Sequence, residues 1–196
     1  MGMKFTQIPA NTYKELQLNA GVLLSDFDPK TATLDLADIL GATDGGVNVT
    51  AVPTYIDLAD GIDNSVKNTK EGKELDSWEF KLSGTFKTVT TDLAKKLLGA
   101  ADVGTTDTTQ VKPRTNLTDA DFFDVWWVGD YSDKHSAAAG GYIAIHLINA
   151  LSTGGFSIQS AEKDKGSFAA EFTAHASAAT PEVCPFEIYI KAGTGE

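Results

Sequence analysis

Residues 78–90 read WEFKLSGTFKTVT, and this stretch decides the predicted fold because apolar and polar side chains alternate along it. One face would carry Trp78, Phe80, Leu82, Gly84 and Phe86, and the other Glu79, Lys81, Ser83, Thr85 and Lys87. A period of two is typical of a β-strand with one buried and one polar face. Fully extended, the run would span roughly 40 Å, about twice the length of a usual strand. Its polar face is therefore a candidate for a surface that several subunits build together.

Other stretches also predict strands. Residues 122–129 and 142–150 are apolar on both faces, as strands covered on two sides are. Residues 156–159, 167–176 and 186–191 alternate, and in the last two every second side chain would face inward. The pattern predicts a mainly β fold, a mostly antiparallel β-sandwich or partial barrel with one flanking α-helix.

The predicted helix covers about residues 92–101, with Thr91 as its N-cap and an apolar stripe that includes Leu93 and Leu97. Residues 1–34 are expected to be an N-terminal arm or irregular segment, and residues 35–196 a single β domain. Two long polar loops are expected in that domain, at about 54–76 and 103–120. The first is expected to be mobile or ordered by a partner.

Composition limits the classes of function. The chain has 196 residues and a net charge of -11, with 27 acidic against 16 basic residues. This balance argues against a protein that binds nucleic acid tightly, since such proteins collect lysine and arginine against phosphates. The absence of any long apolar run argues against a transmembrane helix. The single cysteine, Cys184, excludes an internal disulfide, and its apolar neighbours predict a buried side chain.

A search for catalytic and metal-binding patterns finds none. The three histidines at 135, 146 and 175 are far apart, and His146 within an apolar strand is expected to be a core or interface residue. Asp57, Asp60 and Asp63 lack the spacing of a calcium-binding EF-hand loop. We therefore expect no catalytic residues, metal or cofactor, and no enzymatic activity. A β-rich hydrolase that uses a pair of acids is the alternative from the enzyme class.

Trp126 and Trp127 are adjacent, so on a strand they point to opposite faces. One indole would then fill the core while the other meets a helix or a neighbouring subunit. A second alternative is an all-β carbohydrate-binding or adhesin module, which would need one of the two indoles exposed at a groove.

Several segments together resemble the major tail tube proteins of long-tailed, siphovirus-like bacteriophages and prophages. The likeness covers roughly residues 35–191. The segments that carry it are NTK at 68–70, DSWEFKLSGT at 76–85, WWVGDYSD at 126–133, GYIAI at 141–145, NALSTGGF at 149–156 and PFEIYI at 185–190.

The resemblance implies a β-sandwich-like subunit that forms hexameric rings, which stack into a tube for genome delivery. Inner strands of neighbouring subunits would join into a barrel, and loops and arms would tie one ring to the next. Candidate lumen-facing residues are Glu79, Lys81, Ser83, Thr85 and Lys87. Candidate interface residues are Asp57, Asp60, Lys67, Lys70, Trp126 and Trp127.

The resemblance also implies partners and a location. The protein would bind copies of itself and other tail proteins such as the tape measure and tail terminator proteins. DNA would pass through without sequence-specific binding, and no stable membrane insertion is expected. The protein would be part of the virion, assembled in the host bacterial cytoplasm. The inner tube of a contractile tail or of a bacteriocin-like particle is the alternative within the same class of assembly.

Overall fold

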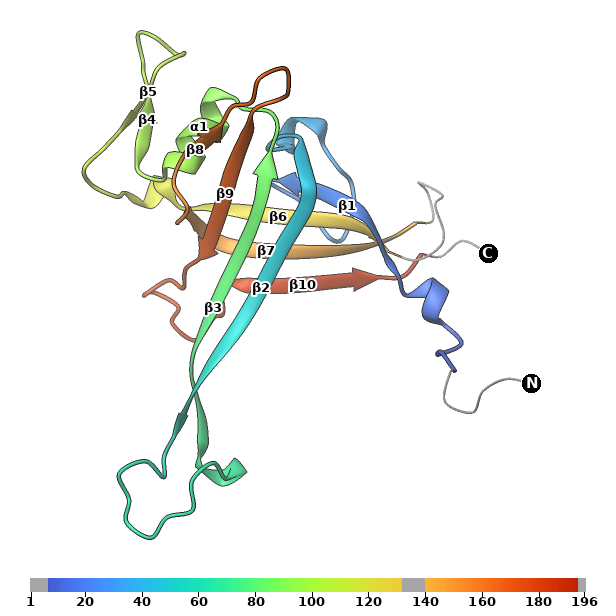
Figure 1. Cartoon of the computed structure of the whole chain (residues 1–196), viewed down its shortest axis with the longest axis vertical. Coiled ribbons are helices and arrows are strands. Elements are labelled where there is room, and N and C mark those ends of the chain that lie inside the picture. Colours follow the sequence, from blue (N-terminus) through green and yellow to red (C-terminus); the bar gives the residue numbers. More distant parts are fainter. Residues whose placement is uncertain (1–6, 132–139, 194–196) are drawn as a thin grey trace.

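The computed structural model describes residues 7–131 and 140–193 (Figure 1), so the prediction for residue 135 lies outside the described residues. Within these residues, one α-helix, α1 (Thr91–Leu98), accompanies the strands, and four short 3-10 helices lie in the loops. The strands are β1 (Gln17–Leu24), β2 (Thr43–Asp57), β3 (Lys73–Phe86), β4 (Ala101–Val103), β5 (Val111–Pro113), β6 (Phe123–Tyr131), β7 (Gly141–Ser152), β8 (Ser157–Gln159), β9 (Ser167–Ala174) and β10 (Phe186–Lys191). The 3-10 helices are η1 (Thr12–Lys14), η2 (Leu36–Asp38), η3 (Lys70–Gly72) and η4 (Asp119–Asp121). The prediction of a mainly β, antiparallel fold with one helix is confirmed.

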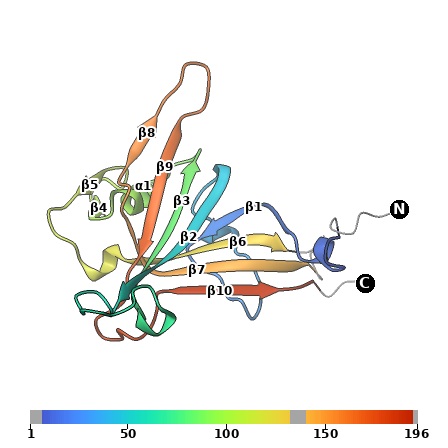
Figure 2. The same ribbon diagram turned by 60° about the horizontal axis from the view of Figure 1, so that its bottom comes forward.

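Eight strands form two crossed layers. The first, called the β6/β7 layer, has the order β1-β6-β7-β10, and the second, the β2/β3 layer, has the order β8-β9-β3-β2. The layers are continuous at one corner, where Ala150–Ser152 of β7 pair with Phe172–Ala174 of β9. Figures 1 and 2 show the strands of one layer crossing those of the other at a steep angle. The small hairpin β4–β5 lies beside α1.

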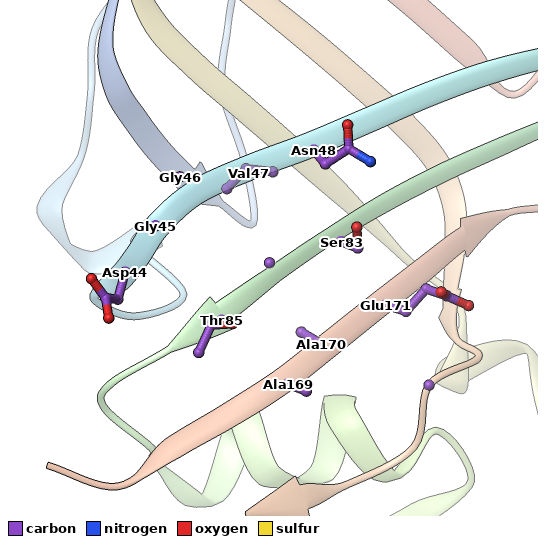
Figure 3. A pocket seen from close by; sticks show the side chains of 12 residues that line it. Asp44, Gly45, Gly46, Val47, Asn48, Ser83, Thr85, Ala169, Ala170 and Glu171 are labelled. Atoms are coloured by element: carbon purple, nitrogen blue, oxygen red, sulfur yellow. The ribbon is translucent and has the colours of Figure 1, made fainter. Parts of the chain in front are cut away.

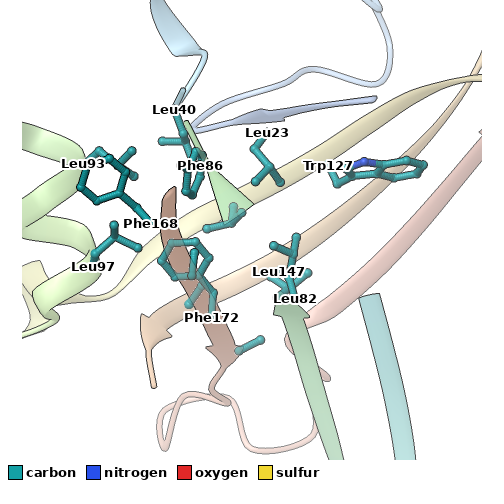
Figure 4. Packing of buried hydrophobic residues seen from close by; sticks show 14 of the residues in the cluster. Leu23, Leu40, Leu82, Phe86, Leu93, Leu97, Trp127, Leu147, Phe168 and Phe172 are labelled. Carbon is teal, nitrogen blue, oxygen red and sulfur yellow. The ribbon is translucent and has the colours of Figure 1, made fainter. Parts of the chain in front are cut away.

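The main core lies between the two layers and α1. Phe80, Leu82 and Phe86 of β3 are 4%, 0% and 0% exposed, which agrees with the predicted inward face of the alternating run. Phe172 and Phe168 of β9 pair with Leu82 and Phe86 in register and therefore point the same way (Figure 4). Leucines from α1 and β7 close this core.

Helix α1 begins one residue earlier than expected. The side chain of Thr90, not Thr91, accepts a hydrogen bond from the Leu93 N–H (3.1 Å) and caps the helix. The helix ends at Leu98, before the predicted end near residue 101, and is capped by Gly99, whose φ of 73° is easily adopted by glycine. Leu93 and Leu97 are buried on the side that faces the β-sheets, as the apolar stripe predicts.

A second, smaller core covers the other face of the β6/β7 layer. It combines Leu24, Phe27, Trp126 and Ala144, so the segment that follows β1 folds across the back of this layer. The expectation of an N-terminal arm or irregular segment over residues 1–34 does not hold for residues 17–24, because β1 pairs with β6 in the sheet.

The long strand is shifted relative to its prediction. β3 begins at Lys73 and ends at Phe86. Beyond Phe86 the Ala42 N–H bonds to the Thr88 hydroxyl instead of to the backbone of β3, and Thr90 then caps α1. β2 pairs with β3 over nearly its whole length, so the expected loop at 54–76 is shortened to residues 58–72. The expected loop at 103–120 contains β5 and the start of η4, and is not continuous coil.

Candidate assembly surface

The polar face predicted for the alternating run is the outer face of the β2/β3 layer. Glu79 is exposed, and Lys81, Ser83, Thr85 and Lys87 are half-buried. Neighbouring strands extend this face in register: Ser83 lies between Asn48 of β2 and Glu171 of β9. Lys81 likewise lies between Thr50 and Thr173. The five predicted residues thus belong to one surface that spans several strands.

Ion pairs neutralise the lysines of this face. Lys81 Nζ lies 2.7 Å from Glu79 Oε1, and Lys87 Nζ lies 3.3 Å from Asp44 Oδ2. The hydrogen bond with Glu79 raises the pKa of Lys81 above its ordinary value. Cations already engaged with carboxylates offer little free positive charge to phosphate groups. These ion pairs leave the polar face with little unpaired positive charge.

A shallow hollow of about 620 Å³ lies on this face, between β2, β3 and β9 (Figure 3). Gly45 and Gly46, with φ of 76° and 79°, form a bulge in β2 that opens it. Its polar lining is Asp44, Asn48, Ser83, Thr85 and Glu171. Those described lining residues include no histidine, cysteine or lysine that could act as a base or nucleophile beside the hydroxyls. The hollow can donate and accept hydrogen bonds through its hydroxyl, amide and carboxylate groups.

Loop 58–72 connects β2 to β3 at the projecting end of the hairpin, and Asp57 organises it. Its Oδ2 accepts a bond from the Asn68 N–H (2.7 Å) and its Oδ1 one from the Ala59 N–H (3.0 Å). These bonds, the one from Asn68 most strongly, lower the pKa of Asp57 below its ordinary value. Lys73 Nζ stands 3.6 Å from Asp57 Oδ2. These bonds tie the loop to the end of β2, and its expected mobility or ordering by a partner stays a prediction.

Three of the other predicted interface residues also lie in this loop. Lys67 Nζ contacts Asp60 Oδ1 at 2.8 Å, and both side chains are largely exposed. Lys70 Nζ lies 3.5 Å from Glu71 Oε1. The sequence prediction thus grouped residues that lie together, although Asp57 turns inward to hold the loop and is not itself a free contact residue.

The predicted interface role of Trp126 and Trp127 is wrong. The two indoles point to opposite faces of β6 as expected, but they are only 6% and 8% exposed. Trp127 packs in the main core and donates from Nε1 to the Ala20 carbonyl (3.0 Å). Trp126 packs in the second core beneath Phe27, at 5.7 Å between ring centroids. Neither indole is available to a sugar or to a partner.

A charged cluster next to Trp126 fastens β10 to β6 and β7. The His146 ring stacks on Trp126 (3.8 Å between centroids, 9° between planes) and lies between two carboxylates. His146 Nε2 is 3.1 Å from Asp124 Oδ2, and Nδ1 is 3.4 Å from Glu187 Oε2. The hydrogen bond from Tyr189, followed by the one from His146, lowers the pKa of Glu187. The histidine thus occupies the core position expected of it.

Metal sites and membrane-spanning helices were also sought among the described residues. They contain no group of three or more His, Cys, Asp and Glu side chains placed to hold a metal ion. In the same part of the chain, every helix is too short or too polar to cross a membrane. Cys184 is exposed, which corrects the prediction of a buried thiol.

The apolar residues at the ends of the layers were not recognised as surface residues from the sequence. Trp78 is 41% exposed, although it continues the buried side of β3. Ile188 and Ile190 alternate as inward-facing residues do, but they are also exposed. The sequence signal for their exposure is the length of the alternating run, because the alternation continues past the end of the opposing layer.

Comparisons with known proteins identify no family for this chain. No family model matches the chain, and no curated protein matches it. One solved structure, described as the virion of a native gene transfer agent particle, aligns with 88% of this chain and 96% of its own chain. The TM-score is 0.42 and the sequence identity is 10%. A likeness at this level assigns neither a fold family nor a function.

Proposed function

We propose that the protein is a non-enzymatic structural subunit that assembles into stacked rings, and that these form the tail tube of a phage-like particle. The observation that carries the proposal is the β2/β3 layer, which combines a broad polar face with two open strand edges. β2 pairs only with β3 among the described strands, and β8 only with β9. The sequence resemblance to tail tube proteins points the same way.

Open edges support assembly by strand pairing. β2 is 15 residues long and presents its unpaired backbone groups along one edge. An edge of that length is an aggregation hazard unless it is covered or paired. Pairing of β2 with the β8 edge of the next copy would continue the sheet around a ring, with the polar face on one side throughout. A contact between two different edges closes into a ring when the rotation allows it, and stacking of rings then needs a second contact along the axis.

The charge on the polar face supports a conduit. Its lysines are paired with acids, and the chain as a whole is acidic. A lumen with few free cations would let DNA slide through, because phosphate binding depends on lysine and arginine. The projecting loop 58–72 would reach the next ring of the stack, with the exposed apolar residues Leu58, Ile62 and Val66 at its surface. A contractile-tail inner tube would use the same contacts, and a neighbouring sheath gene would distinguish it.

The edge proposal can be tested with two proline variants of β2. Pro53 has no N–H, so its position on β2 is expected to face the open edge. Residues two apart in an antiparallel strand direct their N–H groups to the same side, so Ala51 would also face outward and Thr50 would face β3. We expect Ala51→Pro to leave the monomer folded and abolish assembly, and Thr50→Pro to destabilise the monomer itself.

Negative-stain microscopy and sedimentation velocity over a range of protein concentrations would measure assembly, and circular dichroism would measure folding. Hollow rings or tubes of uniform width are expected for the wild type. A wild type that stays monomeric at every concentration, also when preformed tube fragments are added as nuclei, would contradict the proposed function. Normal assembly of Ala51→Pro would contradict pairing through this edge.

A further inference from the structure

The two layers of the sandwich are offset, so each has apolar side chains that the other does not cover. At the β8 edge, Phe156 and Ile158 are 41% and 57% exposed. Ile158 is paired with Phe168, and the Phe156 ring lies 5.9 Å from the Phe168 ring. Phe168 is a buried core residue. Phe156 and Ile158 therefore lie on the core-facing side of the β2/β3 layer, at an edge that the β6/β7 layer does not reach.

The β6/β7 layer has the complementary overhang on β10. Ile188 and Ile190 pair with Ile145 and Ile143 of β7, which pack against the main core. The two β10 isoleucines thus belong to the core-facing side, yet they are 54% and 61% exposed. Coverage ends at Phe186, the first residue of β10, whose ring stacks on Phe80 of β3 at 4.7 Å.

The two overhangs lie on opposite sides of the β2/β3 layer. Both views show β10 running out past β2, while β8 lies at the other side, beyond β9 (Figures 1 and 2). On one side of the molecule, the β2/β3 layer does not extend over Ile188 and Ile190 of the β6/β7 layer. On the other side, the β6/β7 layer does not extend under Phe156 and Ile158 of the β2/β3 layer. The uncovered layer on one side is therefore the layer that is missing on the other.

We propose that two apolar strips, Phe156 with Ile158 at the β8 edge and Ile188 with Ile190 on β10, bind each other between copies of the chain. In this contact, which we call the lap joint, Phe156 and Ile158 of one copy would pack on Ile188 and Ile190 of the next copy. This inference rests on the proposed function, and it names the apolar contact that accompanies pairing of β8 with β2. The partner that covers each strip is a second copy of the chain, because the layer that is missing over each strip is the layer that the opposite side of the chain provides. Such a contact joins different surfaces, so it propagates and does not close at two copies.

The first test places a charge in each strip. Ile158→Glu and Ile190→Glu alter side chains that are exposed in the single chain, so folding and thermal midpoint should not change. In the joint, the glutamate would be buried without a partner, which disfavours assembly. We expect at least about a tenfold rise in the concentration at which half of the protein is assembled, measured by sedimentation velocity. Leu36→Glu is the matched control, since Leu36 is 77% exposed and belongs to neither strip.

The second test uses cross-linking between two differently substituted proteins. Cys184 is first replaced by serine, because it is an exposed thiol. Ile158→Cys and Ile190→Cys are then made in separate chains, mixed under assembly conditions and oxidised. A disulfide-linked dimer is expected in the mixture and not from either protein alone, because the joint brings residue 158 only against residue 190.

The outcomes separate the two proposals. If the wild type assembles, but both glutamate variants assemble as well as the Leu36→Glu control, the lap joint is wrong and the proposed function stands. A cross-link formed by either cysteine protein alone, or none from the mixture while assembly proceeds, also overturns the lap joint. If the wild type forms no assembly even with added nuclei, the proposed function fails and the lap joint fails with it.

Discussion

Both halves of β3 carry large apolar side chains, but their surroundings differ. From Phe80 to Phe86 the inward side chains are almost fully buried beneath the β6/β7 layer and α1. Trp78 continues the inward face but is 41% exposed, and Leu75, which lies beyond a register shift in the pairing with β2, is 47% exposed, because the hairpin projects beyond the core. The comparison teaches that alternation defines a strand and its faces, whereas burial depends on whether another layer extends far enough to cover it.

The largest contrast between the halves is expected from truncation of their apolar side chains. Phe86→Ala would empty a fully buried site and should lower the free energy of unfolding by about 3–5 kcal/mol. Leu75→Ala removes a half-exposed side chain and should lower it by less than about 0.5 kcal/mol. Urea denaturation of the monomer measures both. Equal losses would show that the projecting half is also covered in solution.

A smaller effect is expected where the buried half of β3 meets α1. Thr90→Ala removes the side-chain oxygen that accepts from the Leu93 N–H, and should lower the free energy of unfolding by about 1 kcal/mol. Thr91→Ala is the control, because Thr91 is already inside the helix and makes no cap. Thermal or urea unfolding of the two variants should rank Thr90→Ala as the less stable. The opposite ranking would place the cap at Thr91, as the sequence alone predicted.

The smallest global effect is expected at the projecting half. Asp57→Asn weakens the bonds to the Asn68 and Ala59 N–H groups, so loop 58–72 should exchange its amide hydrogens faster while the core stays protected. Asp60→Asn is the control, since its carboxylate is exposed and bonds to the Lys67 side chain. Hydrogen exchange at neutral pH measures the difference. Unchanged protection of the Asn68 amide in Asp57→Asn would refute the role of Asp57.

The same loop should respond to acid. Because the pKa of Asp57 is lower in the folded chain, its ionised form stabilises the loop at neutral pH. That contribution is complete above the ordinary aspartate pKa of about 3.9 and is lost as the pH falls through the lowered folded value. Wild-type loop protection should therefore decrease below about pH 4, whereas that of Asp57→Asn should not change in this range.

The sequence predicted the strand and the two faces of its decisive stretch but not which residues cover it. The two faces of β3 and the opposite orientations of Trp126 and Trp127 follow from a period of two. Burial of Trp126 could not be predicted, because its cover includes Phe27, in a segment with no periodic pattern. The exposure of Ile188 and Ile190 was missed for a related reason. How far one layer extends over another depends on contacts that are distant in sequence, and local alternation does not record them.

The candidate surface was predicted in part. The polar residues of β3 lie on one face, but their neighbours on β2 and β9 depend on register, which local pattern does not determine. The four charged residues near the loop were grouped correctly because they are close in sequence. The inward turn of Asp57 depends on a bond to Asn68 across the loop, and aspartate alone gave no signal of it.

The position of the three tryptophans gives the protein an internal optical reporter. Two indoles are buried in separate cores, and the third, Trp78, is half-exposed where the hairpin leaves the sandwich. Indole emission shifts to longer wavelength in water, so the red edge of the intrinsic fluorescence belongs mainly to Trp78. A blue shift on that edge would therefore report the moment at which another surface covers the base of the hairpin. No label is needed to follow it.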